Sequence, residues 1–280
     1  MSITALALAA YILLPAQTAV SLFWKTDSLQ VNEIVSEQAV QYKSVGHHGP
    51  AVENLFCALR LYFNDSGAID VYSKSGKQME LLKYLWYPTE NQQEREGAGC
   101  DEYKVGKTVG LGGIAIWDGE KEVKLTATRG RTARVGKMRG GSFAEMIAYG
   151  VLYNGEPVDV SIRVEMKDRS RIARVTASEL NGRKVQFLTG VNYHPGETVE
   201  YGRKYISVWG VHPADVSQNP GALGGGMWFR ASRFLPPEKT QDMVRILSKP
   251  ASRIRTRIVT ASVKETELDT AEKFAAYMRH

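Results

Sequence analysis

Histidine is the residue type in this sequence best suited to move protons near neutral pH, because small changes in its surroundings alter its charge. The chain has five histidines. Four lie in three polar and aromatic segments: GHHGPAVEN contains His47 and His48, VNYHPG contains His194, and WGVHPAD contains His212. The fifth, His280, is the last residue and is expected to fray. These segments predict acid–base chemistry in a site assembled from distant parts of the chain.

The segment 52–63 reads as a strand, in which alternate residues face opposite sides. One of its faces is apolar and is expected in the core; it carries Leu55, Cys57, Leu59, Leu61 and Phe63. The other face carries Arg60 and Tyr62, two residues apart. We expect this second face to line a polar cleft, which His48 would join if the strand begins early. A solvated outer face is the alternative.

Two later segments would bring further groups to the cleft. His194 is expected on the polar face of a strand over 185–193, directly before a Pro-Gly turn. After the segment 203–209, Gly210 can bulge the strand and re-aim His212. Trp209 would then be a platform on which a sugar stacks, with a core tryptophan as the alternative reading.

Known metal and nucleophile motifs are missing from the sequence. It contains no HExxH, no CxxC, no G-x-S-x-G elbow and no phosphate-binding loop. A divalent metal stays open, because four residues are of ligand type: His47, His48, Glu53 and His212. No cofactor is assigned. The two cysteines, Cys57 and Cys100, allow either one disulfide or two free thiols.

The charge balance favours an anionic partner. The chain has 280 residues, 36 of them basic and 30 acidic, which gives a net charge of +6. No recognition helix, zinc-finger spacing or aromatic RNA-binding motif is present, so nucleic acid is not expected. An acidic oligosaccharide is the partner that we expect. The sequence does not indicate an oligomeric state.

The N-terminal segment has two readings. Ala5–Leu14 is apolar enough for a signal peptide, but no basic residue precedes it and no clear cleavage site follows. It is too short to span a bilayer, so no integral membrane segment is expected. We therefore treat 1–32 as an N-terminal strand or signal-like segment and 33–280 as one β-sandwich catalytic domain. A periplasmic or secreted location is expected.

Strict alternation of apolar and polar residues dominates the chain and is clearest in 158–167. Strands are also expected over 122–128 and 256–263. Three Asx-Gly pairs between strand-like runs predict hairpins: Asn154-Gly155, Asn181-Gly182 and Asp118-Gly119.

Helical signals are few. One short helix is expected over 238–249, after Pro236-Pro237, and another over 270–280, capped by Thr266 with Asp269. The chain is therefore predicted to be mainly β, a large antiparallel β-sandwich with one or two short helices near the C-terminus.

Several motifs together resemble a bacterial family that has been labelled only as a domain of unknown function. They are HHGPAVENLFCALRLYF, AIDVYSK, LWYPTENQ and GCDEYKVGKTVGLGGIAIWDG, with weaker matches at FLTGVNYHPG, YISVWGVHPADV and TASVKETELDTAEKFAAY. Genes of this family occur in polysaccharide-utilisation loci. The resemblance implies a sandwich similar to galactose-mutarotase-like enzymes and a role in acidic-glycan breakdown, as in ulvan-type pathways. At least one branch is an oligosaccharide dehydratase that leaves a 4,5-unsaturated sugar.

This sequence departs from the family pattern in one respect, and the family itself varies in a second. Relatives usually carry a longer region before the histidine motif. Some relatives lack the double histidine and keep only the part that corresponds to Glu53-Asn54, which weakens a shared catalytic role for both His47 and His48.

Elimination from a uronate requires a cation for the carboxylate, a base for the C5 proton and an acid for the departing C4 oxygen. We expect the carboxylate to be bound by Arg60 or Lys104. His194 or His212 is expected to be the base, and Tyr62 or His48 the acid. Further substrate contacts are expected from His47, Glu53, Asp101 and Trp209.

Three other functions compete with a carbon–oxygen lyase. A sugar epimerase or mutarotase would use similar groups without making a double bond. A glycoside hydrolase would need two carboxylates in one cleft, for which Glu53 and Asp101 are candidates. A non-catalytic carbohydrate-binding module would rely on an aromatic platform from Trp86, Trp117 or Trp209.

Overall fold

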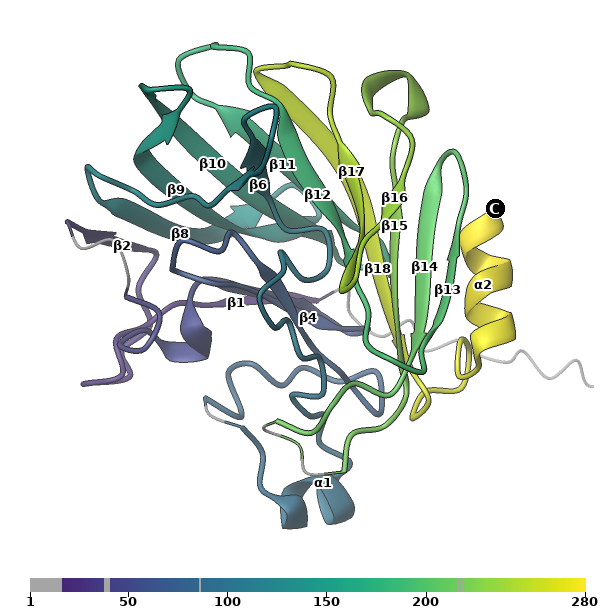
Figure 1. The fold of residues 1–280 in the computed structure, drawn as a ribbon. Helices are drawn as coiled ribbons and strands as arrows, with labels where there is room; N and C mark the ends of the chain where they lie inside the picture. Colours follow the sequence, from purple (N-terminus) through teal and green to yellow (C-terminus); the bar gives the residue numbers. More distant parts are fainter. Residues whose placement is uncertain (1–16, 38–40, 86, 216, 218) are drawn as a thin grey trace, which may run out of the picture.

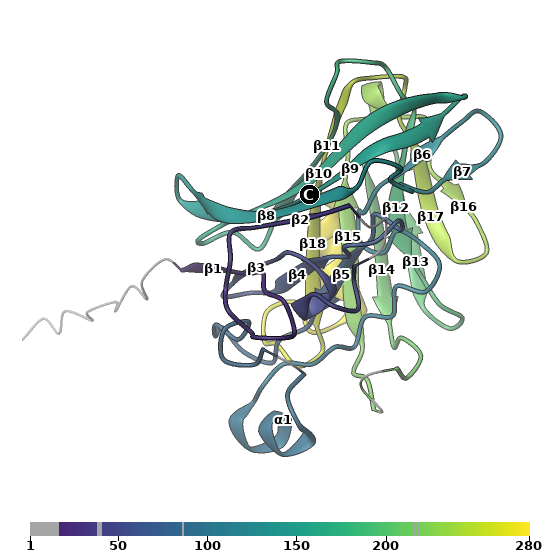
Figure 2. The same cartoon turned by 90° about the vertical axis from the view of Figure 1, so that its left-hand side faces the viewer.

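The structure, a computed structural model, describes residues 17–37, 41–85, 87–215, 217 and 219–280. The signal-like segment Ala5–Leu14 and Trp86 lie outside these residues. Within them the chain forms three antiparallel sheets. The largest sheet sweeps across the molecule, and the smaller sheets lie against its concave side (Figures 1 and 2).

The nine-stranded sheet supplies most of the scaffold. In spatial order its strands are β13 (Thr198–Tyr201), β14 (Tyr205–Gly210), β15 (Leu223–Trp228), β18 (Arg253–Ser262), β11 (Ala173–Glu179), β10 (Glu156–Lys167), β9 (Gly141–Tyr153), β8 (Arg131–Met138) and β2 (Glu33–Ser36). The four-stranded sheet has the order β1 (Thr18–Ser21), β3 (Ala51–Asn54), β4 (Ala58–Leu61) and β5 (Ile69–Tyr72). The five-stranded sheet has the order β16 (Glu238–Lys239), β17 (Met243–Leu247), β12 (Phe187–Asn192), β6 (Ala115–Trp117) and β7 (Glu122–Val123).

Helices are short and lie at the periphery. The described residues form two α-helices, α1 (Glu90–Glu96) and α2 (Ala271–Arg279), and two single 3₁₀ turns, Gly46–His48 and Ala231–Arg233. Helix α2 packs on β14 and β15, whereas α1 projects from the far end of the molecule (Figure 1). None of the helices in the described ranges is both long and apolar enough to cross a membrane.

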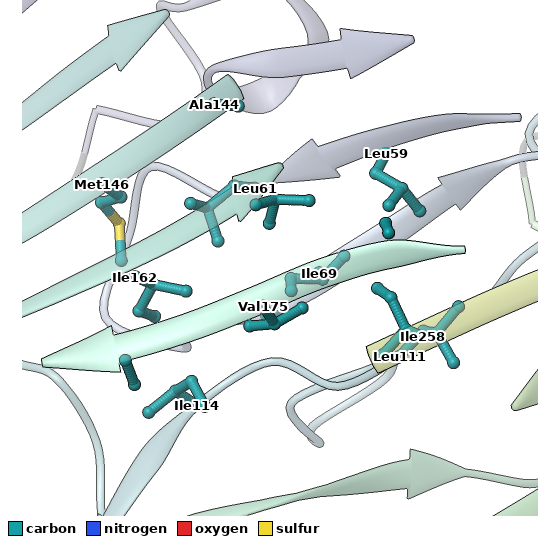
Figure 3. Packing of buried hydrophobic residues seen from close by; sticks show 14 of the residues in the cluster. Leu59, Leu61, Ile69, Leu111, Ile114, Ala144, Met146, Ile162, Val175 and Ile258 are labelled. Atoms are coloured by element: carbon teal, nitrogen blue, oxygen red, sulfur yellow. The ribbon is translucent and has the colours of Figure 1, made fainter. Parts of the chain in front are cut away.

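One hydrophobic core joins the three sheets. Leu59, Leu61 and Ile69 of the four-stranded sheet face Ile162 and other apolar residues of the large sheet (Figure 3). Each such side chain, when fully buried, contributes roughly 1.5–3 kcal/mol of transfer free energy. The core therefore fixes β4 and β5 against the large sheet, and these two strands carry part of the candidate site.

The predicted mainly β, antiparallel fold with short helices is confirmed. In β10 the alternate residues from Val158 to Met166 are buried, as the pattern predicts. Asn154-Gly155 joins the paired strands β9 and β10, and Asp118-Gly119 joins the paired strands β6 and β7. Asn181-Gly182 is different, because it leads from β11 to β12, which lies in another sheet.

Three local predictions are wrong. The expected strand over 52–63 is two strands, because Asn54 Oδ1 accepts hydrogen bonds from the backbone N–H groups of Phe56 (2.9 Å) and Cys57 (3.3 Å) and turns the chain. The strand expected over 122–128 is only the two residues of β7. The helix expected over 238–249 is the β16–β17 hairpin, because Val244 and Ile246 are buried in the common core.

The helix ends also differ from expectation. Helix α2 forms as predicted, but its cap is Thr270, whose side chain accepts from the N–H of Lys273 at 3.3 Å. Helix α1 was not expected. Its start is a capping box in which the side chains of Thr89 and Gln92 each bond the other's backbone, and its end is Gly97 in the left-handed region.

Candidate functional site

A polar cleft with a volume of about 290 Å³ lies beside the four-stranded sheet. Its walls come from the segment before β3, from Tyr62 directly after β4, from the two loops that flank α1, and from the loop after β14. The lining side chains that matter for chemistry are Tyr42, His48, Tyr62, Tyr87, Asp101 and Lys104. The cleft therefore brings together His48, Tyr62, Asp101 and Lys104 from the predicted set.

His48 is held in an unusual backbone conformation. His47 and His48 have φ values of 52° and 62°, in the left-handed region that non-glycine residues seldom adopt. Such residues cost about 1–3 kcal/mol each and cluster at functional sites. The conformation turns the His48 ring to Tyr42 and Tyr87.

The hydrogen bonds of His48 define its tautomer. Nδ1 lies 3.1 Å from the carbonyl oxygen of Tyr42, which can only accept, so Nδ1 carries the hydrogen. Nε2 then presents a lone pair, 3.1 Å from the hydroxyl of Tyr87. Burial lowers the pKa of His48, and the charge of Arg60 acts in the same direction. His48 is therefore a neutral imidazole with its basic nitrogen at the cleft.

Arg60 is the centre of a buried ionic network. It pairs with Asp70 and with Asp101, the latter at 2.5 Å, and donates to the hydroxyl of Tyr87 at 3.3 Å. Because only 1% of Arg60 is exposed, its guanidinium is committed to these partners. Arg60 thus organises the cleft wall, and the structure does not support its predicted role as the carboxylate ligand.

Asp70 couples this network to Tyr62. The hydroxyl of Tyr62 donates to Asp70 Oδ2 at 2.7 Å. Burial raises the pKa of Asp70, and the neighbouring Asp101 raises it further, because one guanidinium cannot neutralise two carboxylates. Burial also raises the pKa of Tyr62 far above its ordinary value. Tyr62 therefore stays a neutral proton donor with a carboxyl behind it.

Lys104 lines the cleft next to this network, and its main chain is held from behind. His212 Nδ1 accepts a hydrogen bond from the Lys104 N–H at 2.9 Å. The Lys104 carbonyl oxygen lies 2.9 Å from both Asn192 Nδ2 and His194 Nε2. Within the described part of the chain, the Lys104 ammonium makes no ion pair, so it is available to an anionic ligand.

These contacts correct the roles expected for His194 and His212. Only 2% of His212 is exposed, and burial lowers its pKa to about 3. Nδ1 of His212 and Nε2 of His194 are both engaged with Lys104. Neither histidine lines the cleft, so neither is placed to take a proton from a substrate there.

Three further predicted residues lie outside the cleft. Glu53 is fully buried, pairs with Lys74 at 2.5 Å and accepts from the N–H groups of Glu80 and Leu81. His47 lines a smaller cavity of about 60 Å³ that shares His48 and Tyr87 with the cleft, and burial lowers the pKa of His47 to about 3. Trp209 is partly buried against Phe274 of α2 on the outer face of the large sheet, with ring centroids 5.7 Å apart.

The expected metal ligands do not assemble. In the described ranges no three histidine, cysteine or acidic side chains converge in a way that could hold an ion. Glu53 is paired with Lys74, and His212 lies behind Lys104. The two cysteines are buried free thiols, and burial raises the pKa of Cys57 to about 12.

The sequence-based selection missed Asp70, Tyr87 and Glu197. For Asp70 a signal exists, since it alternates with the apolar Ile69 and Val71 and lies on the polar face of its strand. Tyr87 and Glu197 lie in a loop and in a turn, where no periodicity indicates direction.

A family model described as a domain of unknown function, DUF4861, matches residues 12–280, so the chain belongs to this family. This confirms the resemblance of the motifs to a family labelled as a domain of unknown function. A search of curated proteins finds no significant match to the sequence.

Three solved structures are similar to this chain. A heparan sulfate lyase HepC mutant from Pedobacter heparinus is 8% identical, with a TM-score of 0.40 over 76% of this chain and 34% of that one. A 4-alpha-glucanotransferase from Thermococcus litoralis is 11% identical, with a TM-score of 0.36 over 75% and 37%. A Klebsiella pneumoniae subsp. pneumoniae protein named as an aldose 1-epimerase is 7% identical, with a TM-score of 0.37 over 94% of both chains.

All three names are those of carbohydrate-processing proteins. The chain spans about a third of the length of the first two. Because all three TM-scores are below 0.5, we base the proposed function on the geometry of the cleft.

Proposed function

We propose that this member of the DUF4861 family is a carbon–oxygen lyase, a dehydratase that acts on uronate-containing oligosaccharides. One observation carries the proposal, which is that three groups line the same cleft: a neutral histidine whose basic nitrogen is bonded only by the Tyr87 hydroxyl among the described residues, a tyrosine with a buried carboxyl behind it, and an ammonium group with no ion-pair partner in the described ranges. These are the base, the acid and the carboxylate ligand that uronate elimination requires.

In the proposed reaction the Lys104 ammonium binds the uronate carboxylate and withdraws charge from C5. The Tyr87 hydroxyl turns from His48 to Asp101, its other hydrogen-bond partner, and so frees His48 Nε2. His48 Nε2 then takes the C5 proton. This fits its lowered pKa, because an imidazole that is neutral near pH 7 can accept a proton.

The leaving group is protonated from the other side of the network. In the reactive state Asp70 is protonated, which its raised pKa of about 7 allows, and its hydrogen bond with Tyr62 is reversed, so that Asp70 donates to the Tyr62 oxygen. Tyr62 then gives its hydroxyl proton to the departing C4 oxygen and takes the proton of Asp70. The C5–H and C4–O bonds break, a C4=C5 double bond forms and water leaves. Solvent then deprotonates His48 and reprotonates Asp70, which restores the starting state.

The experiment that tests the proposal is incubation of the purified protein with defined oligosaccharides that end in a uronate. A rise in ultraviolet absorbance, with loss of one water by mass spectrometry, is the expected result. The matched control is the same oligosaccharide with the uronate reduced to its neutral sugar, which offers no carboxylate to Lys104. If the absorbance does not change with any uronate substrate, with or without added divalent metal, the proposal is refuted.

The other functions predict different products. An epimerase or mutarotase would use the same base and acid but would return a saturated sugar. A hydrolase would split the oligosaccharide, although its two candidate carboxylates are separated: Glu53 is buried with Lys74, and Asp101 is paired with Arg60. A binding module would show affinity with no product. A new double bond distinguishes the lyase from all three.

A further inference from the structure

Behind the wall of the cleft lies a buried polar cluster that the proposed reaction does not use. It consists of His194, Glu197 and His212, together with Asn192 and Tyr103. The ring of His212 stacks on Tyr103 at 4.4 Å and meets His194 at 4.6 Å between centroids. Unpaired buried polar groups are costly, so a cluster of this size requires an explanation.

In the described part of the chain, the hydrogen bonds from this cluster to the cleft wall end on the main chain of one residue, Lys104. The Lys104 N–H donates to His212 Nδ1, and the Lys104 carbonyl oxygen accepts from Asn192 and His194. The main-chain N–H and carbonyl groups of Lys104 are therefore both held by side chains, which come from β12, from the turn after it and from the loop after β14.

Glu197 connects the two histidines. Its Oε2 accepts from the backbone N–H of His194 at 2.8 Å, and its Oε1 lies 3.5 Å from Nε2 of His212. Because Nδ1 of His212 accepts from Lys104, Nε2 must carry the ring hydrogen. Glu197 Oε1 lies 3.5 Å from that nitrogen and makes no hydrogen bond in the described structure. The nearby carboxyl oxygen favours a hydrogen on Nε2, which leaves Nδ1 free to accept from Lys104.

We propose that Glu197 and His212 are positioning residues, which hold the Lys104 ammonium at the place where the uronate carboxylate binds. This inference rests on the proposed function, because Lys104 is the carboxylate ligand there. It assigns to two buried residues a role in substrate affinity without contact to the substrate. The geometry resembles the general arrangement in which an acid group orients an imidazole that in turn orients a reacting partner.

The first test concerns the tautomer and needs no substrate. Nitrogen-15 NMR of the histidine rings, with His212 assigned by the signals lost in His212→Asn, should show Nδ1 without a hydrogen and Nε2 with one. In Glu197→Gln the same tautomer should persist, because the amide oxygen still accepts, whereas Glu197→Leu should lose the preference. A His212 ring protonated at Nδ1 in the unaltered protein would overturn the inference.

The second test is a double-mutant cycle on binding of D-glucuronate, measured by calorimetry. His212→Asn should weaken binding about ten-fold, because a small displacement of a charged contact has large effects. In Lys104→Met the same change should have no further effect. Glu238→Gln on the exposed β16 is the matched control and should bind as the unaltered protein does.

The outcomes separate the two proposals. If His212→Asn weakens glucuronate binding equally in the Lys104 and Lys104→Met backgrounds, the positioning role is wrong. It is also wrong if the unaltered protein does not bind glucuronate. If the effects of His212→Asn and Lys104→Met on binding are coupled but the protein produces no unsaturated sugar, the positioning role is upheld and the lyase proposal is refuted. Unfolding temperatures of the variants, measured in parallel, identify any loss that comes from misfolding.

Discussion

Arg60 and Asp70 lie directly opposite each other in the antiparallel pair of β4 and β5, and they form a buried ion pair that Asp101 shares. This cross-strand pair ties the strand register to the chemistry of the cleft. A shift of β5 by one residue against β4 would turn the Asp70 side chain to the opposite face, into the apolar core and away from Arg60. The same pairing therefore stabilises the fold and places Tyr62 and Asp101 at the cleft.

Removal of the guanidinium should destabilise the protein strongly. Arg60→Met leaves Asp70 and Asp101 buried without their cation, at a cost of about 3–5 kcal/mol in the free energy of unfolding. Urea denaturation followed by circular dichroism measures the change. Arg134→Met, at a largely exposed pair with Glu33, is the control and should cost under about 1 kcal/mol. Similar losses for both variants would contradict the buried network.

The ammonium of Lys104 should affect the reaction with substrate but not the stability of the fold. Lys104→Met should lower kcat/KM about 100-fold, with a higher KM and a lower kcat, because the lost contact both binds the carboxylate and acidifies the C5 proton. The unfolding temperature should be unchanged, since the ammonium has no ion-pair partner among the described residues. Lys107→Met, an exposed lysine of the same loop, should behave as the unaltered protein. An unchanged KM in Lys104→Met would count against the assigned role.

His48 and Tyr62 should affect kcat more than binding. His48→Gln and Tyr62→Phe each remove a proton-transfer group and should lower kcat by about 10²–10⁴-fold. Steady-state kinetics on a uronate-terminated oligosaccharide give kcat and KM separately. Binding of glucuronate by calorimetry should stay within a few-fold of the unaltered protein. Full activity in either variant would remove that residue from the mechanism.

Glu197 should make stability depend on pH. Burial raises the pKa of this carboxyl from 4.5 to about 7 in the folded protein. The folded state therefore binds the proton more tightly than the unfolded chain, so stability rises as pH falls from about 7 toward 4.5. Because the side chain is buried, the gain over this range is about 2–3 kcal/mol.

The check is a comparison of unfolding free energies at pH 7.5 and pH 5 with those of Glu197→Gln, which cannot titrate. The variant should lack this part of the pH dependence. Identical pH profiles for the two proteins would contradict a buried carboxyl with a raised pKa.

The fold was predictable where burial and periodicity act together. The alternation in β10 follows from its one buried face, and the same rule placed Arg60 of β4 and Tyr62, which follows it, on one side of the chain, where both bond Asp70. Predictions from local sequence signals were wrong where side-chain packing favours another structure. After Pro236-Pro237 the chain forms a hairpin instead of a helix, because Val244 and Ile246 are buried in the core.

The site was harder to predict, because its contacts depend on how distant segments pair. Asp70 meets Arg60 only through the β4–β5 register, which the sequence does not state. His212 was predicted as a catalytic histidine, and its residue type gives no warning that it faces the back of the Lys104 peptide. Trp209 alternates with core residues, yet α2 covers its face of the sheet.

In the proposed reaction, His48 takes the C5 proton of a uronate bound by Lys104. A uronate-terminated oligosaccharide deuterated at C5 tests this step, with the rate of double-bond formation followed by ultraviolet absorbance. We expect an unsaturated product, a slower rate with deuterium under single-turnover conditions, and loss of the product signal in His48→Gln. An unaltered protein that forms no unsaturated sugar, or a His48→Gln variant as fast as the unaltered protein, would contradict it.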